Sequence, residues 1–396
     1  MTGHRIDCAQ PKIDVALGQS PSRRDLFSRV LIGFFALFLL TPSLVQLIGP
    51  NTDGTAENRV LAPPPTLPLS FDDLSGLSSQ AEAYVNDRFG LRAELVGLNS
   101  LARYYLGLSS TPLVAAGRQG WLFYAGERLL EQHTGNDIFT AESLEWWVST
   151  MEAYRDWLAQ RGIAFYILLA PDKSTIYPEM LPAYQPRRGA INRVDQLVDR
   201  LKRSTLEFID PRAAIIQAKT SHPQLYPRGD SHWSQRAAYI AYSQLMERLH
   251  PRFPSVPAVP LEDFDAIQGE GAADLVRLLG LQKDVHYTEE LLNRRSPSHI
   301  LRVDITPAHT TDWGWPVNHI SNDLEGRPRL LSFGDSFTDY VLGPSFLYQT
   351  FSNPVHTHHN GGNFNLDLVR ETKPDLVVFE FAERYLRLLP SPPSGD

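Results

Sequence analysis

Residues 330–340 read LLSFGDSFTDY, and this stretch decides the fold. An apolar run of strand character, residues 330–333, ends at Gly334 and leads through Asp335 and Ser336 into residues 338–348, which we expect to be helical. In an open α/β sheet, ligands bind beyond the carboxyl ends of the strands. A serine at such a turn is a candidate nucleophile, because the turn exposes its hydroxyl and the helix N-terminus supplies amide donors. A turn that only caps the next helix explains the same residues, so the choice depends on the rest of the chain.

Strands and helices alternate on both sides of this turn. Residues 163–170 form a nearly continuous apolar run, which is typical of a strand buried on both faces of a parallel sheet. Further strands are predicted at 206–209, 329–333, 351–357 and 375–381, and amphipathic helices at 141–161, 191–203 and 234–249. Residues 250–325 contain several prolines and little periodicity, which indicates an insertion. We therefore expect an α/β fold with a doubly wound, mostly parallel sheet flanked by helices.

Near the N-terminus, residues 30–49 form an apolar run without a charge. About twenty such residues are enough to span a bilayer. The run directly follows a polar segment that contains Arg23, Arg24 and Arg29, and flanking arginines favour the cytoplasmic side. We predict a cytoplasmic tail at 1–29, a single-pass inner-membrane helix at 30–49 and a catalytic part in the periplasm. A cleaved export signal is the alternative, because residues 22–27 look somewhat like a twin-arginine signal, but no Ala-x-Ala site follows the run.

The remaining organisation follows from composition. Residues 50–115 are predicted to be a proline-rich linker and a leading helical segment with a break at 89–90, and residues 116–390 the catalytic domain. The net charge of -8 argues against a nucleic-acid partner. The only cysteine is Cys8, so the chain has no internal disulfide and no paired-cysteine metal motif.

A second informative stretch is RGDSHWS, residues 228–234. Asp230 and His232 are two residues apart, so in an extended loop the carboxylate reaches the imidazole and fixes its tautomer. Ser234 is placed to cap the following helix. An aspartate turn beside a surface histidine is the plainer explanation. Together with Ser336, however, the two loops supply a nucleophile and an oriented base, as acyl transfer through a serine ester requires.

These residues resemble a known family. Residues 334–337 are similar to the first block of SGNH hydrolases, and residues 230–233 to the Asp-x-His-Trp signature of the alginate O-acetyltransferases AlgJ and AlgX, in which the Asp-His pair also precedes the serine. Supporting similarities occur at 57–63, 87–92, 120–123, 172–178 and 383–384. Because the chain ends after its last strand, without the carbohydrate-binding module of AlgX, the membrane-anchored AlgJ-like form is expected.

The resemblance implies roles for the two motifs. Ser336 matches the nucleophile, His232 the general base and acid, and Asp230 the orienting acid. The implied reaction forms an acetyl-serine and transfers the acetyl group to a hydroxyl of an exported polysaccharide. The implied partners are the polysaccharide acceptor and a membrane-bound acyltransferase that presents the acetyl group. A carbohydrate esterase with the same triad, or a polysaccharide-binding subunit without turnover, remains an alternative.

Other residues are candidates for substrate contact or support. The Ser336 amide is one oxyanion donor, and the glycine-rich turn supplies Asn360, Gly361, Gly362 and Asn363. Lys173 follows the strand at 163–170 and is a candidate for a sugar carboxylate or acyl oxygen; Trp233 is a candidate for stacking on a sugar. Structural support is expected from Asp335, which would hold the turn, and from Glu383 and Arg384 with Glu380, as an ion pair that supports the Asp230 loop.

A histidine cluster, His356, His358 and His359, raises the question of a metal. His356 and His358 alternate along a predicted strand and would share one face, as a zinc pair does. The sequence offers no third ligand at a recognisable spacing and no His-Glu-x-x-His helix. We therefore predict no metal site and no cofactor.

Overall fold

The computed structural model describes residues 23–48, 61–66, 74–185 and 191–393. Most of the predicted tail with Cys8, and residues 57–59 of the family resemblance, lie outside the described residues. The chain divides into two compact units, residues 1–96 and 97–396.

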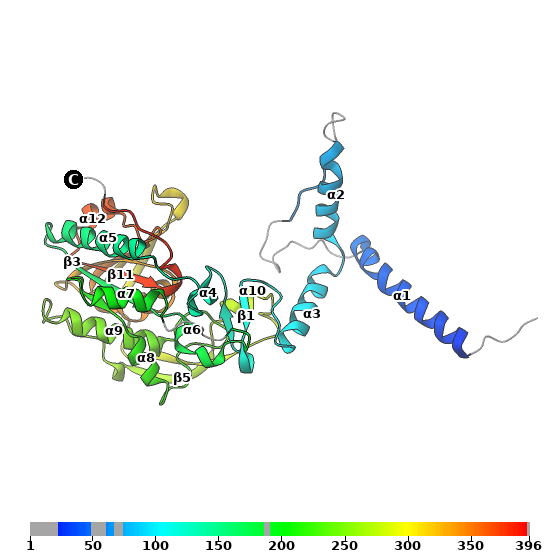
Figure 1. Ribbon diagram of the computed structural model, residues 1–396, viewed down its shortest axis with the longest axis horizontal. Helices are drawn as coiled ribbons and strands as arrows, with labels where there is room; N and C mark the ends of the chain where they lie inside the picture. The colour runs from blue at the N-terminus through cyan, green and yellow to red at the C-terminus, as the bar shows by residue number, and fades with distance from the viewer. Residues whose placement is uncertain (1–22, 49–60, 67–73, 186–190, 394–396) are drawn as a thin grey trace, which may run out of the picture. The chain divides into compact units, whose positions relative to one another are not determined.

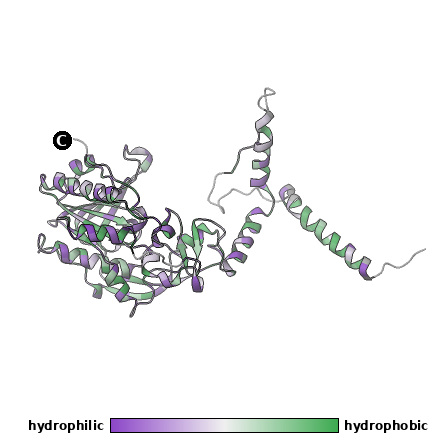
Figure 2. Ribbon diagram, viewed as in Figure 1, coloured by the Kyte–Doolittle hydropathy of each residue, from purple (hydrophilic) through white to green (hydrophobic). Residues whose placement is uncertain are grey.

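The N-terminal unit contains the apolar helix predicted from the sequence. Helix α1 (Arg23–Ile48) includes the stretch Leu26–Gln46, which is long and apolar enough to cross a membrane and is coloured as hydrophobic in Figure 2. The stretch begins four residues before the predicted start and includes Arg29. It is the only such helix among the described residues and fits a single-pass anchor.

The leading helical segment is also present, with its break. Helix α2 (Leu74–Arg88) and helix α3 (Arg92–Tyr105) are separated near Leu91, whose φ of 63° interrupts the helical path. The described part of the proline-rich segment is fixed to α2. Ala62 donates its N–H to Asp87 at 2.7 Å, and Arg88 donates to the Ala62 carbonyl at 2.7 Å.

A seven-stranded sheet forms the centre of the second unit, in the order β4-β3-β11-β9-β10-β8-β7. The parallel strands are β3 (Ala164–Ala170), β4 (Phe208–Ile209), β9 (Arg329–Gly334), β10 (Ser352–His358) and β11 (Leu376–Ala382). Strands β7 (Ile300–Thr306) and β8 (Val317–Asn322) extend the sheet in the antiparallel sense. The predicted α/β class is confirmed, but the predicted insertion is partly wrong because β7 and β8 belong to the central sheet.

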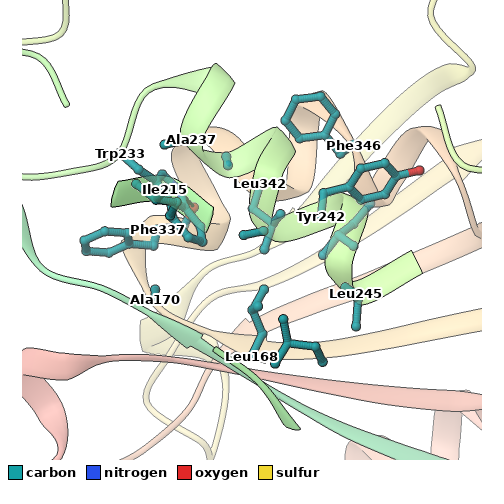
Figure 3. Close-up of a cluster of buried hydrophobic side chains, with 14 of the residues drawn as sticks. Leu168, Ala170, Ile215, Trp233, Ala237, Tyr242, Leu245, Phe337, Leu342 and Phe346 are labelled. Carbon is teal, nitrogen blue, oxygen red and sulfur yellow. Dashed lines mark hydrogen bonds between the residues drawn. The ribbon is translucent and has the colours of Figure 1, made fainter. Parts of the chain in front are cut away.

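Helices cover both faces of this sheet (Figure 1). Helices α5 (Ala141–Ala159), α7 (Arg193–Leu201) and α12 (Leu366–Thr372) pack on one face, and α8 (Arg212–Ala218) and α9 (Gln235–Leu249) on the other. Alternation along β3 explains the two layers, because Leu168 points into the α9 side and Ile167 and Leu169 into the α5 side. Figure 3 shows the α9 layer, where Leu168 and Ala170 lie beneath Leu245 and Phe337.

Smaller elements surround the sheet. Strands β1 (Val114–Ala116) and β2 (Leu122–Tyr124) form a hairpin, and β5 (Phe264–Glu270) pairs with β6 (Thr288–Arg294) as a separate two-stranded sheet. Short helices are α4 (Leu129–His133), α6 (Lys173–Ile176) and α10 (Asp274–Leu278).

The segment after Ser336 differs from the single helix that we predicted. It consists of a π-helical turn at Thr338–Leu342, the short helix α11 (Gly343–Ser345) and a 3₁₀ turn at Leu347–Gln349. Pro344 cannot donate a backbone hydrogen bond, which favours an interruption at this point. Gly343 lies so close to Tyr348 that a Cβ there would be 2.6 Å from the ring and the hydroxyl.

Candidate active site

The turn that carries Ser336 requires a glycine at its start. A Cβ on Gly334 would lie 2.7 Å from the Thr338 hydroxyl and 3.0 Å from Glu380 Oε2. Asp335 then fixes the turn, since its Oδ1 accepts the Phe337 N–H at 2.9 Å and its Oδ2 the Ala382 N–H at 3.1 Å. These two hydrogen bonds are the kind expected of a residue that holds the turn.

Glu380 supports the same turn from beneath. This fully buried side chain lies on β11, and its Oε2 accepts from the Asp335 N–H and the Thr338 hydroxyl, both at 3.0 Å. Burial, together with the neighbouring Asp335 charge, raises the pKa of Glu380 well above its ordinary value. The expectation that Glu380 supports the Asp230 loop is therefore wrong: Glu380 joins β11 to the Ser336 turn.

The loop from residue 230 to 234 brings the predicted base to Ser336. His232 Nδ1 lies 2.8 Å from Asp230 Oδ1, which also accepts the His232 backbone N–H. His232 Nε2 lies 2.7 Å from Ser336 Oγ. Ser234 caps α9 by accepting the Ala237 N–H, as expected. The three side chains form a continuous line, carboxylate to imidazole to hydroxyl, in which Ser336 remains half-buried.

A second carboxylate, Asp274, orients the first. Its backbone N–H donates to Asp230 Oδ2 at 2.9 Å, and its two carboxylate oxygens accept from the N–H and hydroxyl of Ser231 at 2.7 and 2.6 Å. Burial alone would raise the pKa of Asp230, but the hydrogen bonds from His232 and from the Asp274 N–H hold it below its ordinary value. Burial and the Asp230 charge raise the pKa of Asp274. Sequence reasoning missed Asp274, because it lies 44 residues from Asp230.

Lys173 holds the histidine loop and does not face a substrate. Its ammonium group is buried and donates to the carbonyls of Pro227, Arg228 and Asp230 at 2.6, 2.9 and 2.9 Å. Burial lowers the pKa of Lys173 to about 7, against the raising effect of Asp230. The predicted contact of Lys173 with a substrate is wrong, because three carbonyls already use the three N–H donors of its ammonium group.

Arg384 supports the same loop from the other side. The guanidinium contacts the Ser231 hydroxyl at 3.4 Å and the Ser231 carbonyl at 3.3 Å, and it pairs with Asp172. Arg384 therefore contacts the loop that carries Asp230, and its acidic partner is Asp172. Glu383 accepts a hydrogen bond from Thr175, and burial raises the pKa of Glu383 to about 8.

Two aromatic side chains flank His232. Trp233 is 1% exposed and donates its indole N–H to the Phe337 carbonyl at 3.1 Å. It packs in the core shown in Figure 3, so the prediction that it stacks on a sugar is wrong. Tyr340 is instead 68% exposed, and its ring stands at 89° to the His232 ring with 5.0 Å between centroids. Tyr340 therefore presents an exposed aromatic ring beside His232, whereas Trp233 does not.

The glycine-rich turn at 360–363 uses most of its amides internally. The N–H groups of Asn360 and Asn363 donate to each other's carbonyls at 3.3 and 3.0 Å, and the Gly362 N–H donates to His359 Nδ1 at 3.3 Å. The Asn363 side chain accepts the Ser391 N–H and lines a separate cavity of about 640 Å³. These three amides are therefore not free to stabilise an oxyanion; Gly361 and the Ser336 amide remain as predicted donors.

The histidine pair on β10 meets a carboxylate that sequence spacing did not reveal. His356 and His358 both face Asp339, which comes from the turn after Ser336. His359 is separate: its ring stacks on Phe381 at 4.6 Å, and burial lowers the pKa of His359 to about 4.

Comparison with known proteins identifies a family match for one part of the chain. Residues 114–304 match the SGNH hydrolase-like domain of the acetyltransferase AlgX. These residues belong to the AlgX family of SGNH hydrolase-like domains. The matched part contains Asp230 and His232, and Ser336 follows it. The resemblance predicted from the sequence is therefore confirmed for these residues.

Relatives extend this match over more of the chain. The chain is 24% identical over 327 residues to the probable alginate O-acetylase AlgJ of Pseudomonas aeruginosa. The aligned region covers 78% of this chain and 80% of the relative. It is 25% identical over 326 residues to the probable alginate O-acetylase AlgJ of Pseudomonas putida, with the same coverage. The Bacillus cereus PatB1 structure with a sulfonyl adduct shares the fold, with a TM-score of 0.51 and 15% identity over 70% of this chain and 95% of that one.

Proposed function

We propose that this chain is an O-acetyltransferase that moves an acetyl group through Ser336 to hydroxyls of an exported polysaccharide, with alginate-like polymers as the first candidates. The observation that carries the proposal is the line Asp230–His232–Ser336, with 2.8 Å and 2.7 Å between successive polar atoms. The relatives named as probable alginate O-acetylases support the reaction and the substrate class.

Each side chain has a role in this reaction. His232 Nε2 accepts the Ser336 proton as Oγ attacks the acetyl carbonyl, and Asp230 stabilises the imidazolium that forms. His232 then returns the proton to the leaving group, which gives an acetyl-serine. A sugar hydroxyl next gives its proton to His232 and attacks the acetyl carbon, and the ester bond to Ser336 breaks as Oγ takes the proton back.

The location of the enzyme is part of the proposal. We place helix α1 in the inner membrane, the catalytic domain at residues 116–390 in the periplasm, and a membrane-bound acyltransferase beside it as the acetyl source. An anchor raises the effective concentration of the domain at such a donor. The apolar stretch Leu26–Gln46 supports the anchor.

The test measures both products of the acetyl-enzyme. Full-length protein in detergent is incubated with an acetyl ester and oligosaccharides of several polymers, and mass spectrometry follows acetylated sugar and free acetate. We expect acetylated sugar from the wild type and none from Ser336→Ala. Ser345→Ala is the matched control, because the Ser345 hydroxyl accepts from Gln235 and its loss should leave the rate unchanged. Free acetate without acetylated sugar would favour an esterase, and product from Ser336→Ala would contradict the proposal.

A further inference from the structure

Three side chains of metal-ligand type converge beside the Ser336 turn without taking part in the Asp230–His232–Ser336 line. Asp339 comes from the π-helical turn, and His356 and His358 come from one face of β10. One ligand atom from each lies within 4.8 Å of the other two. His358 is in register with Gly334 of β9, so the cluster lies at the carboxyl edge of the parallel strands.

The hydrogen bonds of His356 leave one ring nitrogen without a donor or acceptor. The ring is fully buried, and Nδ1 lies 2.9 Å from the Ser332 hydroxyl, which itself points to the Val355 carbonyl at 3.4 Å. A hydroxyl has one proton, so a Ser332 that donates to the carbonyl accepts from Nδ1–H. In that tautomer Nε2 presents a lone pair.

In that tautomer the lone pair faces a negative charge. His356 Nε2 lies 2.8 Å from Asp339 Oδ1, within ion-pair distance but without the geometry of a hydrogen bond. A nitrogen lone pair opposite a carboxylate oxygen is repulsive unless a cation lies between them or the ring takes a second proton. A ligating histidine in proteins typically donates its other N–H to a nearby acceptor, as His356 does to Ser332 in this tautomer.

A second buried polar atom without a partner lies beside the cluster. The Tyr348 hydroxyl makes no hydrogen bond, and the Tyr348 ring is 6.5 Å from the His356 ring. Buried polar groups in native proteins are almost always hydrogen-bonded, so two such atoms on neighbouring rings point to a missing group.

The ligand set matches transition-metal chemistry. Two imidazoles and one carboxylate are the protein ligands of many zinc sites, which keep a fourth position for water or substrate. With bonds of about 2.1 Å, tetrahedral ligand atoms lie about 3.4 Å apart. The Asp339 carboxylate lies 2.8 Å from His356 Nε2 and closer to His358 Nε2, so it must withdraw from both rings. Asp339 is suited to this shift because its side chain is 24% exposed and lies on an irregular turn. The ring of Trp315 stacks on His358 at 4.7 Å and fixes its plane.

The other group of this kind, Asp230, His232 and Asp274, differs in one respect. Its carboxylate oxygens and ring nitrogens are already paired, with Ser231, with Ser336 and with one another. In the cluster on β10, His358 Nε2 is hydrogen-bonded to Asp339, but His356 Nε2 is unmatched.

We propose that Asp339, His356 and His358 bind one divalent transition-metal ion, Zn²⁺ in the first instance, and leave a coordination position for water or a substrate oxygen. The test of this site does not depend on the proposed acetyl transfer, because metal binding is measured without any acyl donor.

The test uses full-length protein in detergent, purified without a histidine tag and treated with a chelator. Co²⁺, whose visible absorption reports nitrogen and oxygen ligation, is titrated into the protein, and Zn²⁺ is then added as a competitor. We expect the wild type to bind one equivalent of Co²⁺ per chain and to release it when Zn²⁺ is added. His358→Gln and Asp339→Asn should each weaken Co²⁺ binding by more than about 100-fold. Such a loss exceeds the effect of removing a residue that only contacts a metal ligand.

Two control variants locate the ion. His299→Ala removes a half-exposed histidine that also lies 2.8 Å from an aspartate, Asp323, and His232→Ala removes the histidine of the other group. Both should bind Co²⁺ as the wild type does. Binding that survives in His358→Gln, or that is lost in either control, overturns the proposal. So does a wild-type melting midpoint that does not rise with saturating Zn²⁺, a measurement that needs no substitution.

Discussion

Replacement of Asp230 by asparagine tests whether this carboxylate sets the position of the proton on His232. Oδ1 accepts from the backbone N–H and from Nδ1 of His232, and Oδ2 accepts from the Asp274 N–H. An asparagine has one acceptor oxygen and one NH₂ group. In either orientation of the amide, the NH₂ group meets a position where the aspartate accepted a hydrogen bond.

The structure gives the size of the effect. If the amide oxygen faces His232, the buried Asp274 N–H loses its acceptor, at a cost of about 1–3 kcal/mol in stability. If the NH₂ group faces His232, it donates to Nδ1, and Nε2 then carries a proton and cannot accept one from Ser336. In both cases the imidazolium loses a negative charge 2.8 Å away. We expect a loss of about 10³–10⁴-fold in acyl transfer, or about 4–5.5 kcal/mol in activation free energy.

The assay follows acetyl-enzyme formation from a chromogenic acetyl ester, with full-length protein in detergent and circular dichroism as a check on folding. Asp274→Asn is the matched control. Asp274 lies 3.7 Å from His232 Nδ1, and its oxygens accept from Ser231, so its replacement leaves the tautomer unchanged. This variant should stay within about tenfold of the wild type, or 1.4 kcal/mol. The reasoning is refuted if Asp230→Asn also stays within this range, or if both variants lose activity equally.

Three further predictions concern the supporting residues. Lys173→Met leaves three buried carbonyls without a donor, and this loss is partly offset because an ammonium group is no longer buried. The free energy of unfolding in urea should therefore fall by about 2–4 kcal/mol, and an unchanged value would contradict the assigned role. Gly334→Ala places a Cβ 2.7 Å from the Thr338 hydroxyl and should lower the free energy of unfolding by about 1–3 kcal/mol. Gly97→Ala has open space in α3 and should be neutral or stabilising, so similar melting midpoints for the two variants would count against the steric argument. Glu383 has a pKa raised from 4.5 to about 8, so its contribution to stability is present below pH 4.5 and is lost as the pH rises through about 8. Glu383→Gln should therefore make the melting midpoint less dependent on pH over this range. A pH profile parallel to that of the wild type would show that the Glu383 carboxyl is not protonated.

The sequence predicted the part of the site that is encoded locally. Asp230 and His232 lie two residues apart, and Ser336 follows a recognisable strand and glycine, so both halves of the line could be found from short patterns. The alternating apolar runs likewise predicted the parallel core, because β3 and β11 are buried along their whole length.

The remaining contacts depend on distances that a sequence does not contain. Lys173 was correctly placed at the end of β3, but the direction of its side chain is set by three carbonyls more than 50 residues away. Asp274 and Asp339 are unremarkable aspartates in the sequence and gain their roles only where the chain folds back on itself. β7 and β8 were missed because strands on an antiparallel edge need no continuous apolar run: β7 is largely exposed.

The last strand, β11, has a consequence for the order in which the active site forms. Glu380 and the Ala382 N–H hold the Ser336 turn, and Arg384, just beyond the strand, holds the histidine loop. Both halves of the triad thus depend on residues near the C-terminal end of the described chain. A chain synthesised only as far as Ser336 already contains Asp230, His232 and Ser336 but lacks the supports that align them. The proposed nucleophile and base are therefore aligned only after β11 and Arg384 have been added.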